Sequence, residues 1–316
     1  MPNPNSKSAG VAALALVPGV IWGASFLFIA EGLEILPPMG VTFSRIALGF
    51  ATLALFPAAH RPVPRSDWPK IALLGLVWFA FPMAMFPLAE RYLSSALAGL
   101  LNGATPLFAV AFAAVLARRW PHRAVWTALG AGFLGLLLIA LPSVGEGVNS
   151  LASVGLIVAA LTSYGLAINL AVPLQQRSGA LPVTWRALGV ATVLTLPFGG
   201  PAMLELRWAW GPVLCLLALG VFGTALANAM TATLAGRFGA SAASSVTFVI
   251  PAVAAGLGIT VRGEPISVFA LAGGGVCLVA AWLLARAPSA PAPKPISPTA
   301  TCAAAALLSQ PNPTRP

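Results

Sequence analysis

One arginine of this chain lies within an apolar stretch, where a charge is costly. Arg45 lies inside the segment 39–58, and no other charged residue lies as deep in an apolar segment. An ionisable side chain surrounded by lipid indicates function by default. The same helix face is small and polar, as a cavity wall would be, and it also carries Thr42, Gly49 and Thr52. Two interpretations stay open: Arg45 lines a cavity or pairs with another helix, or its guanidinium reaches the outer headgroups.

Three further groups of polar residues and proline fall at helical spacing. They are Asn102, Thr105 and Pro106; Thr224, Asn228 and Thr231; and Ser244, Thr247 and Pro251. Each group either lines a substrate pathway or makes hydrogen bonds between helices, which contribute about 0.6 kcal/mol each. Pro106 and Pro251 each free a backbone carbonyl one turn earlier. This indicates either a binding site built from broken helices or a static kink.

Aromatic and acidic residues supply the remaining candidates. Trp22, Trp78 and Tyr164 could stack on a solute, although most membrane aromatics are core or interfacial anchors. Glu90 is the best carboxylate for coupling transport to protons, but an interfacial pair with Arg91 is the favoured interpretation. The other acidic residues fall in loops or at the ends of segments, so a proton-driven mechanism finds little support. Exchange or facilitated flux stays open.

Few residues of this chain could support enzymatic chemistry. Metalloprotease, aspartyl and Ser/His sites need His-Glu-x-x-His, paired carboxylates or a histidine at depth. The only histidines, His60 and His122, are distant in sequence, and Asp67 is the only aspartate. No P-loop lysine motif is present, and the three cysteines lack metal spacing. We expect no catalytic residues, no metal and no cofactor; a membrane-embedded enzyme remains an alternative, as does a passive channel or scaffold.

The elements that position these residues are apolar and long. Only 8% of the chain is charged and 59% is hydrophobic, with a mean hydropathy of +0.91. About twenty residues cross the hydrocarbon core as a helix, and lipid requires backbone groups to be satisfied within each segment. We therefore predict an all-α polytopic membrane protein with ten transmembrane helices. They fall near 11–30, 39–58, 69–89, 96–117, 123–141, 153–173, 183–203, 212–234, 241–261 and 266–286.

The basic residues predict the orientation. With the N-terminus in the cytoplasm, thirteen of the 17 Lys and Arg residues fall on the inner side. Only Arg91, Arg207 and Arg262 fall on the outer side. The positive-inside rule therefore places both termini in the cytoplasm and the protein in the plasma membrane. Because the basic residues are spread over alternate loops, the net charge of +10 does not indicate nucleic-acid binding.

The two halves of the chain resemble one another. The sequence 47–52 recurs at 187–192, Trp22-Gly23 aligns with Tyr164-Gly165, and Pro106 aligns with Pro251. Offsets of 140 to 145 residues define a first repeat at 11–141 and a second at 153–286. Because each repeat has five predicted helices, the second must be inverted, as in alternating-access transporters. Residues 1–10 read as a cytoplasmic N-terminus, and the Pro/Ala-rich segment 287–316 as a disordered cytoplasmic tail.

These patterns resemble the drug/metabolite transporter superfamily, specifically proteins with two EamA domains. The cues include Ile21-Trp22-Gly23-Ala24-Ser25-Phe26, Phe43-Ser44-Arg45-Ile46-Ala47 and Arg262-Gly263-Glu264-Pro265. The resemblance covers roughly residues 11–286. Family members often carry Gly-Glu after the fourth helix as well, where this chain has Arg118-Arg119. The resemblance implies ten helices and the export or exchange of a small metabolite or drug, and it does not specify one substrate.

The working hypothesis is a secondary transporter. A small metabolite, which could be amino-acid-like, binds between two five-helix bundles that rock by alternating access. Arg45 assists if the solute is anionic or zwitterionic. The expected partners are this solute and the lipid bilayer, and a homodimer stays open.

Overall fold

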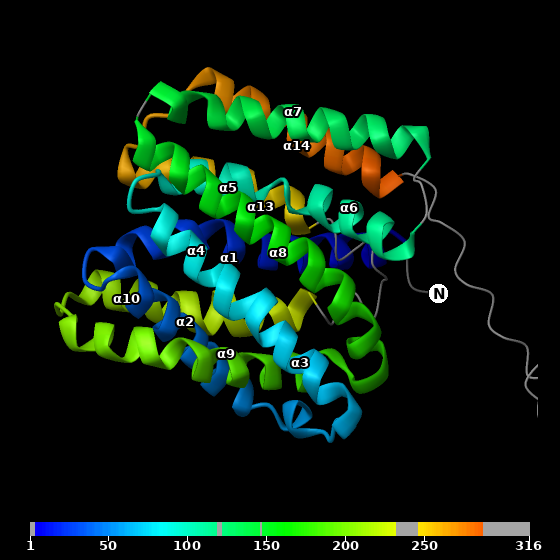
Figure 1. Ribbon diagram of the computed structural model, residues 1–316, viewed down its shortest axis with the longest axis vertical. Helices are drawn as coiled ribbons and strands as arrows, with labels where there is room; N and C mark the ends of the chain where they lie inside the picture. The colour runs from blue at the N-terminus through cyan, green and yellow to red at the C-terminus, as the bar shows by residue number, and fades with distance from the viewer. Residues whose placement is uncertain (1–3, 119–121, 146, 232–245, 287–316) are drawn as a thin grey trace, which may run out of the picture. The chain divides into compact units, whose positions relative to one another are not determined.

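The computed structural model describes residues 4–118, 122–145, 147–231 and 246–286, and every element among them is helical (Figure 1). This confirms the prediction of an all-α fold. Continuous apolar sequence without polar alternation suits helices, because a helix satisfies its backbone hydrogen bonds internally. The predicted tail 287–316 and Ser244 lie outside the described residues.

The first repeat contains seven α-helices, several of them parts of one predicted span. Helix α1 covers Pro4–Leu33 and α2 covers Pro38–Ala54. Two short 3-10 helices, η1 (Pro57–His60) and η2 (Arg65–Asp67), then lead into the third span. This span consists of α3 (Trp68–Leu74), the π-helical η3 (Gly75–Ala80) and α4 (Phe81–Ala89). The fourth is α5 (Ser95–Asn102) with α6 (Thr105–Ala117), and the fifth is α7 (Arg123–Gly145).

The second repeat follows the same plan. It begins with α8 (Val148–Ser178), α9 (Ala180–Ala202) and the 3-10 helix η4 (Met203–Glu205). Helix α10 (Trp210–Ala218) continues into the π-helical η5 (Leu219–Leu226). Helices α13 (Val246–Arg262) and α14 (Val268–Arg286) complete the described chain.

Among the described residues, eight helical segments are long and apolar enough to cross a membrane, and the apolar helix Val246–Arg262 is shorter. Helix α2 is 17 residues long and carries Arg45. The structure therefore confirms a polytopic membrane protein, whereas the count of ten crossings stays a prediction.

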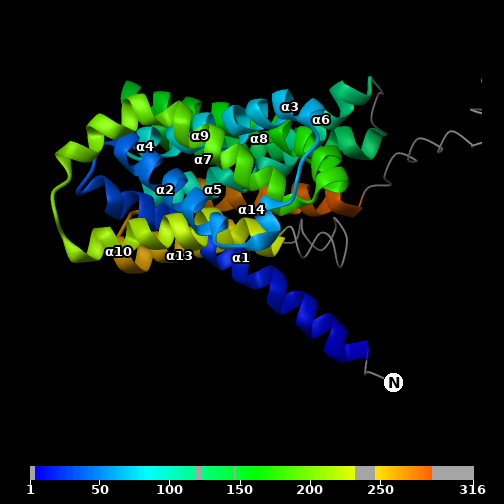
Figure 2. The same cartoon turned by 90° about the horizontal axis from the view of Figure 1, so that it is seen from below.

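The helices of the two repeats pack in matching pairs. Helix α1 packs on α13 and α10 (Figure 2), and its counterpart α8 packs on α6 and α4. Glycines permit the closest of these approaches. A Cβ atom at Gly23 would lie 2.6 Å from the Cβ of Val253, and one at Gly165 would lie 2.7 Å from the backbone of Phe108. Such spacing explains why Gly23 and Gly165 recur in both repeats.

The π-helical segments also correspond, since η5 begins 144 residues after η3. A π-turn is rare and commonly marks a functional position. Each segment accepts a side-chain hydrogen bond from the first helix of the other repeat. The indole Nε1 of Trp22 donates to the carbonyl of Gly223 at 2.9 Å, and the hydroxyl of Ser163 donates to the carbonyl of Val77 at 2.6 Å.

Helices α7 and α14 lie side by side, away from α2 and α9 (Figure 1). Gly135 and Gly273 bring their backbones together, because a Cβ atom at Gly273 would lie 2.5 Å from the carbonyl oxygen of Gly135.

Candidate functional site

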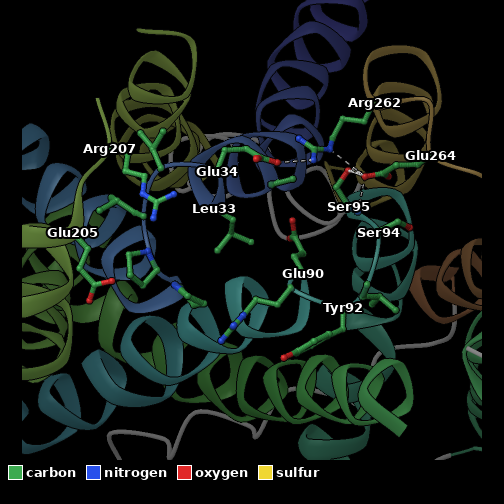
Figure 3. Close-up of a pocket in the computed structure, with 17 residues that line it drawn as sticks. Leu33, Glu34, Glu90, Tyr92, Ser94, Ser95, Glu205, Arg207, Arg262 and Glu264 are labelled. Atoms are coloured by element: carbon green, nitrogen blue, oxygen red, sulfur yellow. Dashed lines mark hydrogen bonds and ion pairs between the residues drawn. The ribbon is translucent and has the colours of Figure 1, made fainter. Parts of the chain in front are cut away.

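A cavity of about 910 Å³ opens where several helix ends meet (Figure 3). Its wall comes from the ends of α1, α4 and α13, the starts of α2 and α5, and the connection between η4 and α10. Charged residues of both signs line it: Glu34, Glu90, Arg91, Glu205, Arg207, Arg262 and Glu264. The wall is therefore suited to a polar solute.

The cavity shows that the two repeats run in opposite directions. The second span begins at the cavity with α2, whereas its counterpart α9 ends there. The fourth span begins there with α5, whereas its counterpart α13 ends there. Corresponding helices thus reach the cavity with opposite ends, one with its start and the other with its end, as an inverted repeat requires.

An ion-pair network joins two helices at the cavity rim. Arg262 Nη1 lies 2.5 Å from Glu31 Oε1, and Arg262 Nη2 lies 3.3 Å from Glu34 Oε1. Arg262 Nε lies 3.6 Å from Glu264 Oε1. The network joins the end of α1 to the end of α13.

Glu264 also caps the start of α5. Its carboxylate accepts hydrogen bonds from the Ser95 backbone at 3.1 Å, the Ser95 hydroxyl at 2.9 Å and the Ala96 backbone at 2.9 Å. A carboxylate at a helix N-terminus satisfies free N–H groups and suits the helix dipole. Glu264 lies outside a helix, as the sequence predicts, and the Gly263-Glu264 motif is the sequence signal for this position.

Backbone geometry at Gly263 matches that of Arg118, which lies 145 residues earlier at the end of α6. Gly263 has φ of +63°, and Arg118 has φ of 49°. An arginine thus adopts the left-handed conformation that the second repeat gives to glycine.

The surroundings of Glu90 differ from those that the sequence favoured. Both of its carboxylate oxygens are buried, and neither has a hydrogen-bond partner among the described residues. Arg91 does not pair with it; its guanidinium lies 5.7 Å from the centre of the Tyr92 ring. The favoured interpretation of an interfacial pair with Arg91 was therefore wrong, because the chain turns Glu90 inward just where α4 ends.

Burial raises the pKa of the Glu90 carboxyl well above its ordinary value, and the negative charge of Glu264 raises it further. The positive charges of Arg45 and Arg262 oppose this rise. Glu90 therefore lies within electrostatic reach of both arginines.

Arg45 is buried rather than extended towards the headgroups, with a relative exposure of 6%. Its Nε donates to the hydroxyl of Thr224 at 3.4 Å. Thr224 donates in turn to the carbonyl of Leu219 at 3.1 Å, and Asn228 Nδ2 donates to the carbonyl of Thr224 at 2.7 Å. The charge of Arg45 also acts on Tyr164 and Glu90. The structure thus brings together sequence candidates from both repeats.

The polar face around Arg45 serves partly for packing. A Cβ atom at Gly49 would lie 2.6 Å from the Thr224 side chain, so α2 and η5 are in direct contact there. The Thr42 hydroxyl is fully buried and donates to the carbonyl of Pro38 at 2.9 Å, with the carbonyl of Met83 at 3.4 Å. Thr42 therefore joins α2 to α4.

The three aromatic candidates lie in different surroundings. Tyr164 stacks on Phe86, with ring centres 6.1 Å apart, and Phe86 contacts Phe26 at 5.6 Å. Trp22 binds the η5 backbone, as described above. Trp78 stacks on the adjacent Phe79 at 5.6 Å. None of the three lines the cavity described here.

The two matched prolines have different surroundings. Helix α5 ends at Asn102, so Pro106 lies in the first turn of α6 and does not kink a helix interior. The Thr105 hydroxyl donates to the carbonyl of Asn102 at 2.7 Å across this break. Pro251 lies inside α13 and packs against Gly103. Thr247 is half-buried in the first turn of α13.

No group of three or more His, Cys, Asp or Glu residues that could hold a metal ion occurs in the described part of the chain.

The membrane helices, the inverted repeats and the cavity define a polytopic membrane protein of the transporter class. The chain belongs to the EamA-like transporter family, whose model matches residues 10–141 and 151–286. The protein is therefore a multi-pass membrane transporter.

Known relatives agree with this assignment. An uncharacterized transporter of Archaeoglobus fulgidus is 21% identical over 84% of this chain and 95% of its own length. The uncharacterized transporter YdfC of Bacillus subtilis is 27% identical over 81% of this chain and 86% of its own length. The uncharacterized inner membrane transporter YedA of Escherichia coli is 26% identical over 78% and 81%.

A solved crystal structure shares the fold. It superposes with a TM-score of 0.60 at 16% identity, and the match covers 87% of this chain and 96% of the other.

Proposed function

We propose that this protein is a secondary transporter that moves a small polar metabolite across the plasma membrane by alternating access. The observation that carries the proposal is the cavity where both repeats meet, with Arg45 and Glu90 buried nearby. A buried charge in a membrane protein that faces a cavity is expected to serve transport.

The described conformation is open on the outer side. Arg91, Arg207 and Arg262 are the three basic residues that the positive-inside rule places outside, and all three line the cavity. Both termini then lie in the cytoplasm. In the opposite state the two five-helix bundles, 11–141 and 153–286, open the site to the cytoplasm.

The wall of the cavity favours a charged or zwitterionic solute over an apolar drug, because both carboxylates and guanidinium groups line it. An amino-acid-like metabolite fits this wall, and the direction of net flux is export or exchange.

Counterflow tests the proposal. The purified full chain is first screened by thermal shift against amino acids, nucleosides and cationic drugs, since a ligand of the folded state raises its apparent stability. Proteoliposomes loaded with the unlabelled solute that binds best are then diluted into labelled solute. A carrier takes up label faster than unloaded vesicles do; equal rates would indicate a channel, and a chemically altered solute would indicate an enzyme.

A further inference from the structure

Glu90 is a buried carboxylate aimed into the cavity without a donor to bind. Both oxygens are buried and have no hydrogen-bond partner in the described ranges of the chain. Figure 3 shows the side chain pointing into the cavity between the walls that carry Arg262 and Tyr92. A buried carboxylate without a partner is costly unless it is protonated or a ligand supplies the donors.

The nearby donors are engaged elsewhere. Arg262 binds Glu31, Glu34 and Glu264. Ser95 directs its backbone N–H and its hydroxyl to Glu264.

Two of the other arginines near Glu90 are also directed elsewhere. Arg91 lies against the Tyr92 ring, and Arg45 donates to Thr224. The cavity wall thus leaves an acceptor whose natural complement is a positively charged donor from outside the protein.

We propose that Glu90 binds the ammonium group of a cationic or zwitterionic solute, which exchanges with a proton at this carboxylate. The inference rests on the proposed transport function, which it deepens by naming the substrate class. An ammonium group carries three donors and a full positive charge, and a carboxylate accepts both.

The proton balance is simple. In the empty carrier the Glu90 carboxyl holds a proton, which leaves to water when the ammonium group binds. The ammonium group keeps its own three protons, so one positive charge replaces another. Burial and Glu264 raise the pKa of Glu90, while Arg45 and Arg262 lower it, so the protonated form persists well above the ordinary range of a carboxyl.

Other groups around the cavity fit the rest of such a solute. Leu33 and Tyr92 supply apolar surface in the same wall. Arg45 lies within electrostatic reach of Glu90 and has no carboxylate partner among the described residues. Arg45 does not itself line the cavity, so it would attract the carboxylate of a zwitterion through its electric field.

The experiment uses matched pairs of probes that differ in the ammonium group. Tyramine is compared with tyrosol, and L-leucine with 2-hydroxy-4-methylpentanoate, in thermal-shift titrations of the full chain in detergent. The amine of at least one pair should stabilise the wild type more than its hydroxyl counterpart. The affinity for that amine should fall as the pH is lowered, because protons compete for Glu90 while the amine stays charged.

Glu90→Gln removes the charge with little change in shape, and it should weaken amine binding at least ~30-fold, as expected when one partner of a buried charge pair is lost. Asp67→Asn makes the same charge change outside the cavity, where the carboxylate pairs with Arg177 at 2.8 Å, and serves as the control. Circular dichroism and detergent gel filtration verify that both variants are folded.

Two results would overturn the inference: no amine binds better than its hydroxyl counterpart, or Glu90→Gln keeps the amine preference of the wild type. Counterflow separates this from the proposed function. A carrier that exchanges an uncharged solute equally well with or without Glu90 is a transporter without an ammonium site. Amine binding without any counterflow would refute the transport function and still support the ammonium site at Glu90.

Discussion

At the scale of single residues, two buried charges from the first repeat define the site. Arg45 comes from the middle of α2 and donates to Thr224 of η5. Glu90 follows the last residue of α4 and has no hydrogen-bond partner in the described chain. Neither charge forms a close ion pair with the other among the described residues, so each can interact with a solute.

Arg45→Ala should reduce counterflow at least ~30-fold, because it removes a buried charge within electrostatic reach of Glu90. Membrane insertion should be unaffected, since α2 becomes more apolar. Thr52→Ala on the same helix is the control, because the Thr52 hydroxyl only donates to the carbonyl of Leu48 in its own helix. Full transport by Arg45→Ala at equal expression would remove Arg45 from the site.

The pH dependence of stability tests the burial of Glu90. The folded state raises the pKa of this carboxyl above that of the unfolded chain, so the folded state binds the proton more tightly. Its contribution to the free energy of unfolding is complete below the ordinary pKa of a carboxyl and is lost as the pH rises through the folded value.

The difference in Tm between wild type and Glu90→Gln should therefore shift in favour of the variant as the pH rises above the ordinary range of a carboxyl. The measurement is thermal unfolding in detergent without added solute. A constant difference over this rise in pH would show that Glu90 titrates normally and is not buried in solution.

At the scale of elements, glycine contacts and helix breaks hold the two repeats together. Helices α7 and α14 approach at Gly135 and Gly273, and η3 and η5 present carbonyl groups to donors from the opposite repeat. The Glu264 carboxylate caps α5 from the turn after α13. These contacts join segments far apart in sequence, so they determine how the cavity walls are placed.

Gly273→Ala should destabilise the protein by about 1–3 kcal/mol, the usual effect of overpacking. The added methyl group would meet two backbone atoms, the Gly135 oxygen at 2.5 Å and the Ile139 nitrogen at 2.8 Å. Gly275→Ala in the same helix is the matched control, since nothing lies within 4 Å of its added Cβ. Chemical unfolding in detergent would measure both, and equal stabilities would contradict the close approach of α7 and α14.

At the scale of the whole molecule, inverted repeats place an open cavity on one side of the membrane. The proposed sidedness, with the cavity on the outer side, rests on the basic residues, because the three arginines predicted outside line this cavity. In alternating access the same repeats would form the opposite opening on the cytoplasmic side.

Cysteine labelling in intact cells tests this sidedness. In a variant with Cys215, Cys277 and Cys302 replaced by alanine, Tyr92→Cys should react with a membrane-impermeant maleimide added outside, since Tyr92 is 51% exposed and lines the cavity. Arg61→Cys, in an exposed loop predicted to be cytoplasmic, should react only after the cells are permeabilised. The reverse pattern would place the cavity in the cytoplasm.

The sequence by itself determined the helical membrane fold, the two repeats and the family, whereas it left the burial of Arg45 open. Each of these follows from local composition, from spacing along one segment or from similarity between the halves. The partner of Arg45, the inward turn of Glu90 and the cap formed by Glu264 were decided only by the tertiary structure. Glu90 directly follows α4, and the backbone conformation there decides whether its side chain reaches the headgroups or the protein interior. That conformation depends on neighbouring helices that are distant in sequence. The adjacent Arg91 in the sequence therefore suggested an ion pair with Glu90 that the folded chain does not form.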